Sequence, residues 1–166
     1  MSLAKEFAAR YAGLRQAYGT FTANNETRED GKASGKNITI SKELSDTDLL
    51  KLWEDHLSGH QSVGIVAIDE HNKCVWGAID VDEYQLDLKD LAIKIAKQKL
   101  PLVLCRSKSG GAHIYLFLTE PVAASMLQRK LRQIAAAIGY GQVEIFPKQT
   151  KLLLDRGDRG STLNMP

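Results

Sequence analysis

Two aspartates separated by one apolar residue are the strongest candidates for chemistry in this sequence. They stand in the segment Ala78-Ile79-Asp80-Val81-Asp82. In a strand, Asp80 and Asp82 would share one face with α-carbons roughly 6.6 Å apart, while Ile79 and Val81 would point to the opposite face. Carboxylates about 4 Å apart repel by on the order of 4 kcal/mol at an effective dielectric of 20, and a bound divalent cation reverses that sign. Hard oxygen ligands favour Mg²⁺ or Mn²⁺, and the alternative interpretation is a strand end with solvated acids.

A third acid, Glu144, lies in a similar apolar setting. Its neighbours Val143 and Ile145 have the alternation of a half-buried strand, so Glu144 is predicted on the face opposite theirs. If this strand lies beside the one with Asp80 and Asp82, three carboxylates converge. Taken alone, Glu144 is better explained as an ordinary solvent-facing strand residue.

The segment from residue 106 to residue 113 has the composition of an anion-binding turn. Its Gly-Gly pair lets backbone N–H groups approach an anion closely. The flanking side chains are hydrogen-bond donors suited to phosphate oxygens. A plain hairpin turn followed by a structural histidine is the alternative. The candidate nucleotide-binding residues here are Arg106, Lys108, Ser109, Gly111 and His113.

The first 62 residues are predicted to form a small unit of helices and a basic loop. Apolar residues recur at three- and four-residue steps from Leu3 to Tyr18, which predicts a helix. Residues 20–41 are polar and rich in Asn, Gly, Lys and Thr, which predicts a long loop. Ser45 begins a capping-box variant that opens a second helix, which ends near Gly59.

The remainder of the chain predicts an α+β fold. We expect an RRM-like, antiparallel-rich sheet with helices on one face. Residues 63–166 would form this sheet and its helices, a core that follows the N-terminal unit of residues 1–62. The first two strands are predicted to pair as a hairpin. The expected elements are strands at 63–68 and 74–82, a helix at 86–100, strands at 102–107 and 113–118, a helix from Pro121 to 138, and a strand at 142–146.

Composition narrows the class of protein further. The chain has 166 residues with 43% hydrophobic and 25% charged side chains, which is typical of one globular domain. Its net charge of +2 is compatible with a nucleic-acid partner without requiring one. Two isolated cysteines, and a His56–His60 pair interrupted by Gly59, do not favour zinc. With neither a signal peptide nor an apolar run of about 20 residues, we expect a cytoplasmic protein without a membrane partner.

Three motifs in this order resemble the archaeo-eukaryotic primase superfamily, the primase-polymerase enzymes of replication. They are Asp80-Val-Asp82, then Gly111-Ala-His113, then Val143-Glu144-Ile145. The sequences around His113 and after Glu144, together with the His-Leu-Ser-Gly segment at 56–59, are similar to those of the branch found in phages and mobile elements. The resemblance extends from about Tyr18 to Pro166 and implies a bacterial, phage or plasmid replication context.

This resemblance implies a template-directed nucleotidyltransferase, a DNA primase or primase-polymerase. Asp80, Asp82 and Glu144 would be catalytic and would hold two Mg²⁺ or Mn²⁺ ions, so that nucleotides are added to a 3′-hydroxyl with release of pyrophosphate. His113 would grip the phosphates of the incoming nucleoside triphosphate, with the turn residues named above as helpers. The other partner would be a single-stranded or primed DNA template, whose backbone would be followed by Lys32, Lys36, Lys148 and Lys151.

The chain departs from this pattern in two places. Gly111 stands where many relatives have serine, so a hydroxyl contact is missing there. The tail Gly160–Pro166 resembles a segment beyond which relatives continue, so we expect a C-terminally truncated domain, and whether a helicase domain belongs to the parent polypeptide stays open. Two other functions also stay open: a non-catalytic RRM-like module that binds single strands through Tyr115 and Phe117, and a metal-dependent nuclease.

Overall fold

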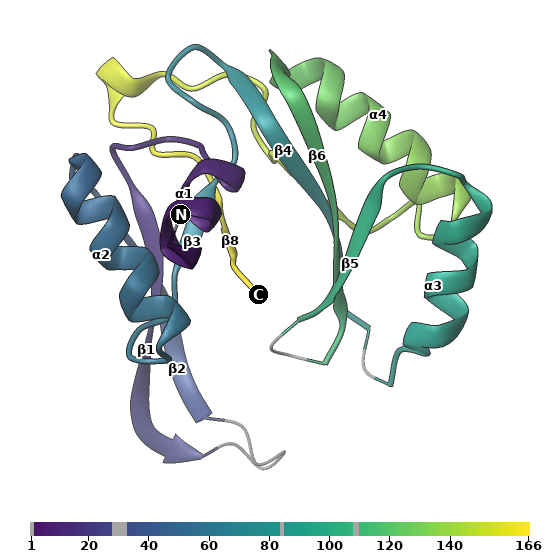
Figure 1. Cartoon of the computed structure of the whole chain (residues 1–166), viewed down its shortest axis with the longest axis horizontal. Helices are drawn as coiled ribbons and strands as arrows, with labels where there is room; N and C mark the ends of the chain where they lie inside the picture. The colour runs from purple at the N-terminus through teal and green to yellow at the C-terminus, as the bar shows by residue number, and fades with distance from the viewer. Residues whose placement is uncertain (1, 28–32, 84, 108–109) are drawn as a thin grey trace.

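Two antiparallel sheets, each of four strands, organise the structure, a computed structural model that describes residues 2–27, 33–83, 85–107 and 110–166 (Figure 1). The first sheet has the order β2-β1-β3-β8 and the second the order β5-β6-β4-β7. Figure 1 shows α3 and α4 on the side of the second sheet that faces away from the first. The elements are α1 (Leu3–Arg10), β1 (Tyr18–Thr27), β2 (Ala33–Ile40), α2 (Asp46–Leu57), β3 (Gly64–Val66), β4 (Lys73–Val81), α3 (Leu88–Lys97), β5 (Leu102–Arg106), β6 (Ala112–Ala123), α4 (Ala124–Ala137), β7 (Glu144–Phe146), the 3₁₀ turn η1 (Leu154–Arg156) and β8 (Thr162–Asn164).

The second sheet confirms the predicted α+β class. Along the chain its elements run β4-α3-β5-β6-α4-β7, and every neighbouring pair of strands in it is antiparallel. This is the strand–helix–strand, strand–helix–strand plan of RRM-like domains, with both helices on one face. Ile79, Val81 and Ile114 point to that face and are fully buried with Leu131 of α4. Strand alternation therefore separates the apolar helix side of β4 from the side that carries Asp80.

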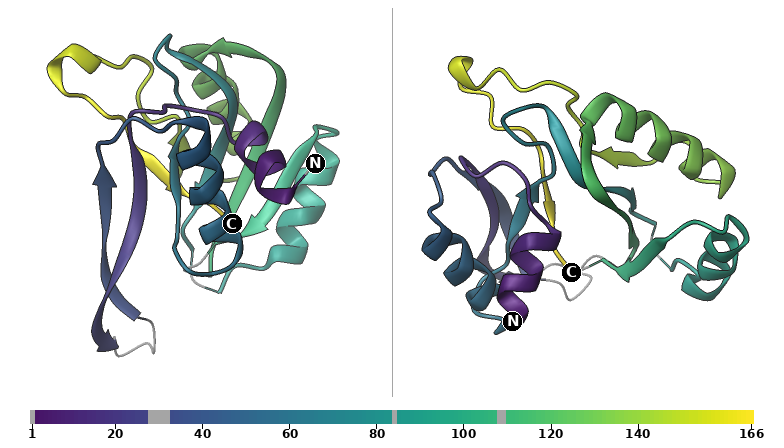
Figure 2. Two further views of the ribbon diagram at one scale, coloured as in Figure 1. Left: turned by 60° about the vertical axis from the view of Figure 1, so that its left-hand side comes forward. Right: turned by 45° about the horizontal axis from the view of Figure 1, so that its top comes forward.

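The predicted loop at residues 20–41 is wrong, because most of this segment belongs to a β-hairpin. β1 and β2 pair from Tyr18↔Ile40 to Thr27↔Ala33, with one irregularity in register. Only Gly19 of β1 pairs with β3, so the outer part of the hairpin projects beyond the rest of the sheet (Figure 2). A strand pair that stands away from the core is held by backbone hydrogen bonds and needs no apolar alternation, which is why the polar sequence did not reveal it.

The predicted pairing of the strands at 63–68 and 74–82 is also wrong. β3 pairs with β1 and β8, whereas β4 pairs with β6 and β7. The expected turn between them exists, since Asp69 N–H donates to the Lys73 carbonyl over 2.8 Å, but it carries the chain from one sheet to the other. All three residues of β3 are buried, and a strand covered on both faces has no alternation to indicate its partner.

Pro121 does not open a helix as predicted; it lies inside β6, and α4 begins at Ala124. β5 accompanies β6 only as far as the pair Leu102↔Leu116, so the end of β6 has one free edge. Proline lacks the backbone N–H that an inner strand must donate, and a strand edge tolerates it. The structure thus continues β6 past the point at which the sequence predicted a helix.

The face of the second sheet opposite α3 and α4 is covered by the N-terminal unit. The Tyr11 ring lies 5.5 Å from that of Trp76 on β4 and 5.4 Å from that of Tyr115 on β6. It also stacks on Trp53 of α2 at 5.6 Å, and the Trp76 indole donates to the Ala12 carbonyl over 2.9 Å. These contacts join the end of α1, α2 and the second sheet in one buried cluster. Asp80, near the end of β4, is partly exposed, and Glu144, at the start of β7, is exposed.

Residues from the N-terminal and C-terminal parts of the chain meet in the first sheet. β3 pairs with β8 through Gly64↔Asn164, Ile65↔Leu163 and Val66↔Thr162. The boundary between an N-terminal unit of residues 1–62 and a core of residues 63–166 stays a prediction. Within the described ranges, none of the helices is both long and apolar enough to cross a bilayer.

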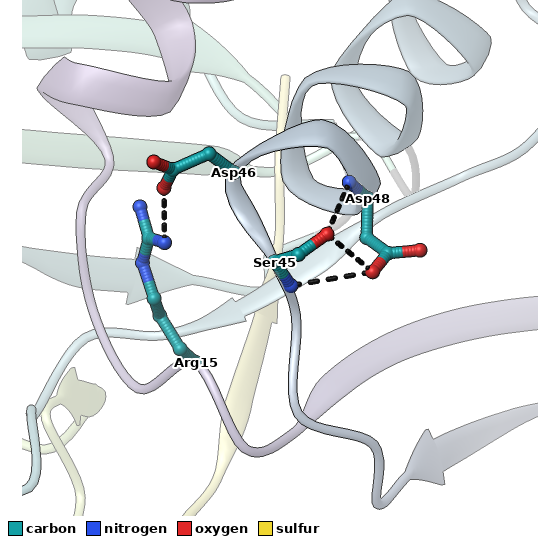
Figure 3. Close-up of polar contacts among 4 residues, drawn as sticks. All are labelled: Arg15, Ser45, Asp46 and Asp48. Atoms are coloured by element: carbon teal, nitrogen blue, oxygen red, sulfur yellow. Dashed lines mark hydrogen bonds and ion pairs between the residues drawn. The ribbon is translucent and has the colours of Figure 1, made fainter.

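Helix α2 begins with the capping box that the sequence indicates (Figure 3). The Ser45 hydroxyl accepts from Asp48 N–H over 3.1 Å, and Ser45 N–H donates to the Asp48 carboxylate over 3.2 Å. Lys42 pairs with Asp48 at 2.9 Å, and Arg15 pairs with Asp46. The hydrogen bond from the Lys42 ammonium lowers the pKa of Asp48 most, and those from Ser45 lower it further, to about 2. These contacts satisfy N–H groups that a helix start would otherwise leave unpaired.

We expect Ser45→Ala to destabilise the protein by about 1 kcal/mol, because the N-cap hydroxyl is lost. Urea unfolding followed by circular dichroism measures the change. Ser41→Ala is the control, since Ser41 is exposed and lies outside the helices and strands. Equal stability of the two variants would contradict a capping role for Ser45.

Candidate active site

Four side chains form one row across the second sheet. Asp80 of β4 pairs with His113 of β6 on one side and with Glu144 of β7 on the other, and His113 pairs with Cys105 of β5. Residues directly opposite each other in a sheet point to the same face, with α-carbons about 4.5–5.5 Å apart. The predicted convergence of the acidic strands is therefore present at the level of the backbone, and a histidine is in the same row.

His113 is held between Asp80 and Tyr115. Its Nε2 lies 3.3 Å from Asp80 Oδ1, and its Nδ1 lies 3.1 Å from the Tyr115 hydroxyl. The His113 side chain is 9% exposed and that of Asp80 is 21% exposed, so this chain of contacts runs from the buried cluster toward solvent. Burial raises the pKa of the Tyr115 phenol, which keeps it neutral. Both ring nitrogens of His113 thus have a polar partner, and in the tautomer with the proton on Nε2 the Tyr115 hydroxyl donates to Nδ1.

Glu144 faces a different partner. Its Oε2 lies 2.6 Å from Lys148 Nζ, and its side chain is 61% exposed. The same ammonium lies 5.0 Å from the centre of the Phe146 ring. Gln128 of α4 donates to the carbonyls of both Pro147 and Lys148, at 2.9 and 2.8 Å. The backbone that carries Lys148 is thus tied to α4, and the lysine side chain reaches back along β7.

Asp82 follows the end of β4 and is exposed. Although Asp80, Asp82 and Glu144 belong to one end of the sheet, no three His, Cys, Asp or Glu side chains in the described part of the chain are gathered as a metal site. The donor set itself fits Mg²⁺ or Mn²⁺, because all three acids offer hard oxygen ligands. The register of β4 and β7 fits as well. In this structure the Glu144 carboxylate contacts Lys148, and that of Asp80 contacts His113.

The turn before His113 is shaped by its glycines. Ser107 N–H donates to the Gly111 carbonyl over 2.9 Å, and Gly110 adopts a φ of 98°. A Cβ on Gly111 would lie 2.1 Å from the Val81 carbonyl oxygen. Glycine is therefore required at this position by the backbone of β4, and a serine would not fit this geometry.

The predicted phosphate-binding residues are only partly brought together. Arg106 pairs with Ala112, and Ala112 pairs with Val81, so Arg106 starts from the helix side of the sheet and not from the face of His113. Lys108 and Ser109 lie outside the described residues. His113 lies in the acidic row and Gly111 adjoins it. Of the five predicted nucleotide-binding residues, the structure places these two at the site.

The lysines predicted to follow a template are spread over two regions. Lys36 is exposed on β2, opposite Thr22, in the projecting hairpin. Lys148 pairs with Glu144, Lys151 is exposed a few residues later, and Lys32 lies outside the described residues.

The alternative of a single-strand-binding module depended on two aromatic residues of β6. Tyr115 is fully buried and contacts the rings of Tyr11 and Trp76. Phe117 is half-buried, with the Tyr11 ring at 5.2 Å and the Arg10 guanidinium at 5.8 Å. A nucleic-acid base stacks on an exposed ring face, and the cover formed by α1 occupies the ring faces of Tyr115 and Phe117. Strand alternation alone could not distinguish an open face from one covered by another layer.

A comparison with protein families matches residues 5–166 to the archaeo-eukaryotic primase domain of the TOTE conflict system. A search of curated proteins returned no match. The match covers nearly the whole chain, so the chain belongs to this family of primase-like nucleotidyltransferase domains. The resemblance drawn from the three motifs is thereby confirmed.

Two contacts of the site could not be read from the sequence. The alternative of a single-strand-binding module places Tyr115 on a nucleic-acid face, whereas in the structure its hydroxyl contacts His113 Nδ1. The one signal in the sequence is the two-residue spacing of His113 and Tyr115, which puts both side chains on the same face of a strand. Lys148 was assigned to the template, yet it pairs with Glu144 four residues earlier. This spacing suggests a contact only in a helix, and here the pair forms across the end of a strand.

We expect Gly111→Ala to destabilise the protein by about 1–3 kcal/mol or more, because the added Cβ meets a backbone atom that cannot move alone. Gly141→Ala is the matched control: a Cβ there would have Ala136 as its nearest contact, at 3.6 Å. Chemical unfolding compares the two variants. Similar stabilities would show that the turn can relax around a side chain.

We expect Tyr115→Phe to leave Nδ1 of His113 without its partner, at a cost of about 1–3 kcal/mol for a buried polar atom. The ¹⁵N chemical shifts of the His113 ring should report a changed tautomer, which a purely packing role of Tyr115 would not cause. Tyr140→Phe is the control, since the Tyr140 hydroxyl makes no hydrogen bond within the described residues. Unchanged ring shifts in Tyr115→Phe would contradict the positioning role.

Proposed function

We propose that this chain is the catalytic domain of a DNA primase or primase-polymerase. Membership of the primase-like family supports the reaction class. The observation that carries the proposal is the register of β6, β4 and β7, which aligns His113, Asp80 and Glu144 side by side. Asp82 follows the end of β4, two positions after Asp80.

In this proposal Asp80, Asp82 and Glu144 hold two divalent ions. When bound, such ions lower the pKa of a primer 3′-hydroxyl and offset the charge of the triphosphate and the departing pyrophosphate. The contribution of the protein itself is to hold the ligand carboxylates in position. Because β4 and β7 are paired through their backbones, the two acidic strands cannot separate when the ligand carboxylates repel one another.

His113 is proposed to contact the phosphates of the incoming nucleoside triphosphate. Tyr115 fixes its ring from the buried side, so that the edge near Asp80 faces the site. Gly111 keeps the preceding turn close to the end of β4. A single-stranded or primed DNA template would complete the substrate set.

We expect Asp80→Asn to lower Mn²⁺-dependent nucleotide incorporation on a primed single-stranded template by more than about a hundredfold. Changing groups that merely orient a metal ligand already costs about 10- to 100-fold, and a ligand should cost more. Glu120→Gln is the control, because Glu120 is exposed on β6 and makes no ion pair within the described residues. Thermal melts verify that both variants are folded.

The same assay separates the alternatives. If Asp80→Ala combined with Asp82→Ala extends primers as well as the unchanged protein, the polymerase proposal is wrong. Degradation of a labelled strand without added nucleotide would instead indicate a nuclease. Binding to single strands that persists in EDTA and ignores Asp80, without incorporation, would indicate a non-catalytic module.

A further inference from the structure

Glu144 makes a close contact with a cation of the chain itself. Lys148 Nζ lies 2.6 Å from its Oε2, at hydrogen-bond distance. Neither side chain is fully buried, with 61% of Glu144 and 37% of Lys148 exposed. The contact therefore lies where an ion from solvent can compete with it.

Lys148 is better positioned than an ordinary surface lysine. Its carbonyl and that of Pro147 both accept from Gln128 of α4. The next residue, Gln149, donates to the Ser161 hydroxyl over 2.8 Å and accepts from Ser161 N–H over 3.1 Å. The lysine ammonium also lies near the ring of Phe146, a buried residue of β7. A surface pair usually loses much of its energy to side-chain entropy, and this anchoring reduces that loss.

We propose that Lys148 is a built-in counter-cation that competes with the divalent ion for Glu144. This inference rests on the proposed function of Glu144 as an ion ligand. An ammonium and a divalent ion in contact with one carboxylate repel each other, so ion binding must displace Lys148. The competition also accounts for the separation of the carboxylates, because Glu144 turns to Lys148 while its backbone stays beside Asp80.

Displacement has a consequence for the substrate. The backbone of Lys148 stays tied to α4, so the released ammonium remains at the edge of the acidic row. Ion binding at Glu144 would thus free one positive charge next to the place where a triphosphate is proposed to bind. Metal binding and the exposure of a phosphate-attracting group would be coupled.

The test is a titration of the whole chain with Mn²⁺ alone, followed by electron paramagnetic resonance of the free ion. Lys148→Met removes the charge and keeps an unbranched apolar stem over Phe146. We expect it to bind Mn²⁺ about two- to fivefold more tightly than the unchanged protein, which is the range of an exposed ion pair. Lys151→Met removes the same charge from a neighbouring lysine that has no carboxylate partner in the described part of the chain. An equal gain in the two variants, or no gain in Lys148→Met, overturns the inference.

A double-mutant cycle makes the assignment specific. In a Glu144→Gln background, Lys148→Met should have no more effect than Lys151→Met, because the competing carboxylate is gone. A gain from Lys148→Met that persists in that background overturns the competition at Glu144.

Asp80→Asn distinguishes the two levels of the proposal. If it weakens Mn²⁺ binding tenfold or more while Lys148→Met behaves like Lys151→Met, only the role of Lys148 fails. If Asp80→Asn leaves Mn²⁺ binding unchanged, the metal site itself is wrong and the inference falls with it.

Discussion

Strand β4 is covered on both faces, and the rest of the structure depends on this constraint. Ile79 and Val81 pack beneath α3 and α4, whereas Trp76 and Ala78 pack beneath the N-terminal unit. A strand with two buried faces can carry polar side chains only where one cover ends. Asp80 lies at that end, beside the starts of β6 and β7, and Asp82 follows two residues later. The position of the acidic row is thus a consequence of where the two hydrophobic clusters stop.

The acids of this row have local partners. Asp80 contacts the imidazole of His113, and Glu144 pairs with the ammonium of Lys148. Each partner lies on the same or an adjacent strand segment, so the acids need not approach one another in the absence of an ion. Since the strands are held by backbone pairing, exchange of these partners requires side-chain rotation and no rearrangement of the sheet.

Much of this arrangement could be predicted from the sequence, and the exceptions have physical reasons. Period-two alternation at Asp80 and Glu144 predicted their shared face, and the Ser45 capping box predicted the start of α2. The β1–β2 hairpin escaped prediction because polar strands that project from a core lack an apolar pattern. The partner of β3 escaped because fully buried strands pair through backbone groups that every residue has. The contact between Lys148 and Glu144 escaped because local spacing does not report which end of a strand two side chains share.

The pairing of β3 with β8 has a consequence for how the chain folds. The paired residues Gly64 and Asn164 are separated by about 100 positions, and the whole second sheet lies in the intervening segment. In chain order the second sheet is therefore an insertion within the first. Closing such a large loop costs conformational entropy unless the intervening residues are already compact. The folding order that minimises this cost forms the sheet of the acidic row first, which brings β8 to β3 and completes the first sheet last.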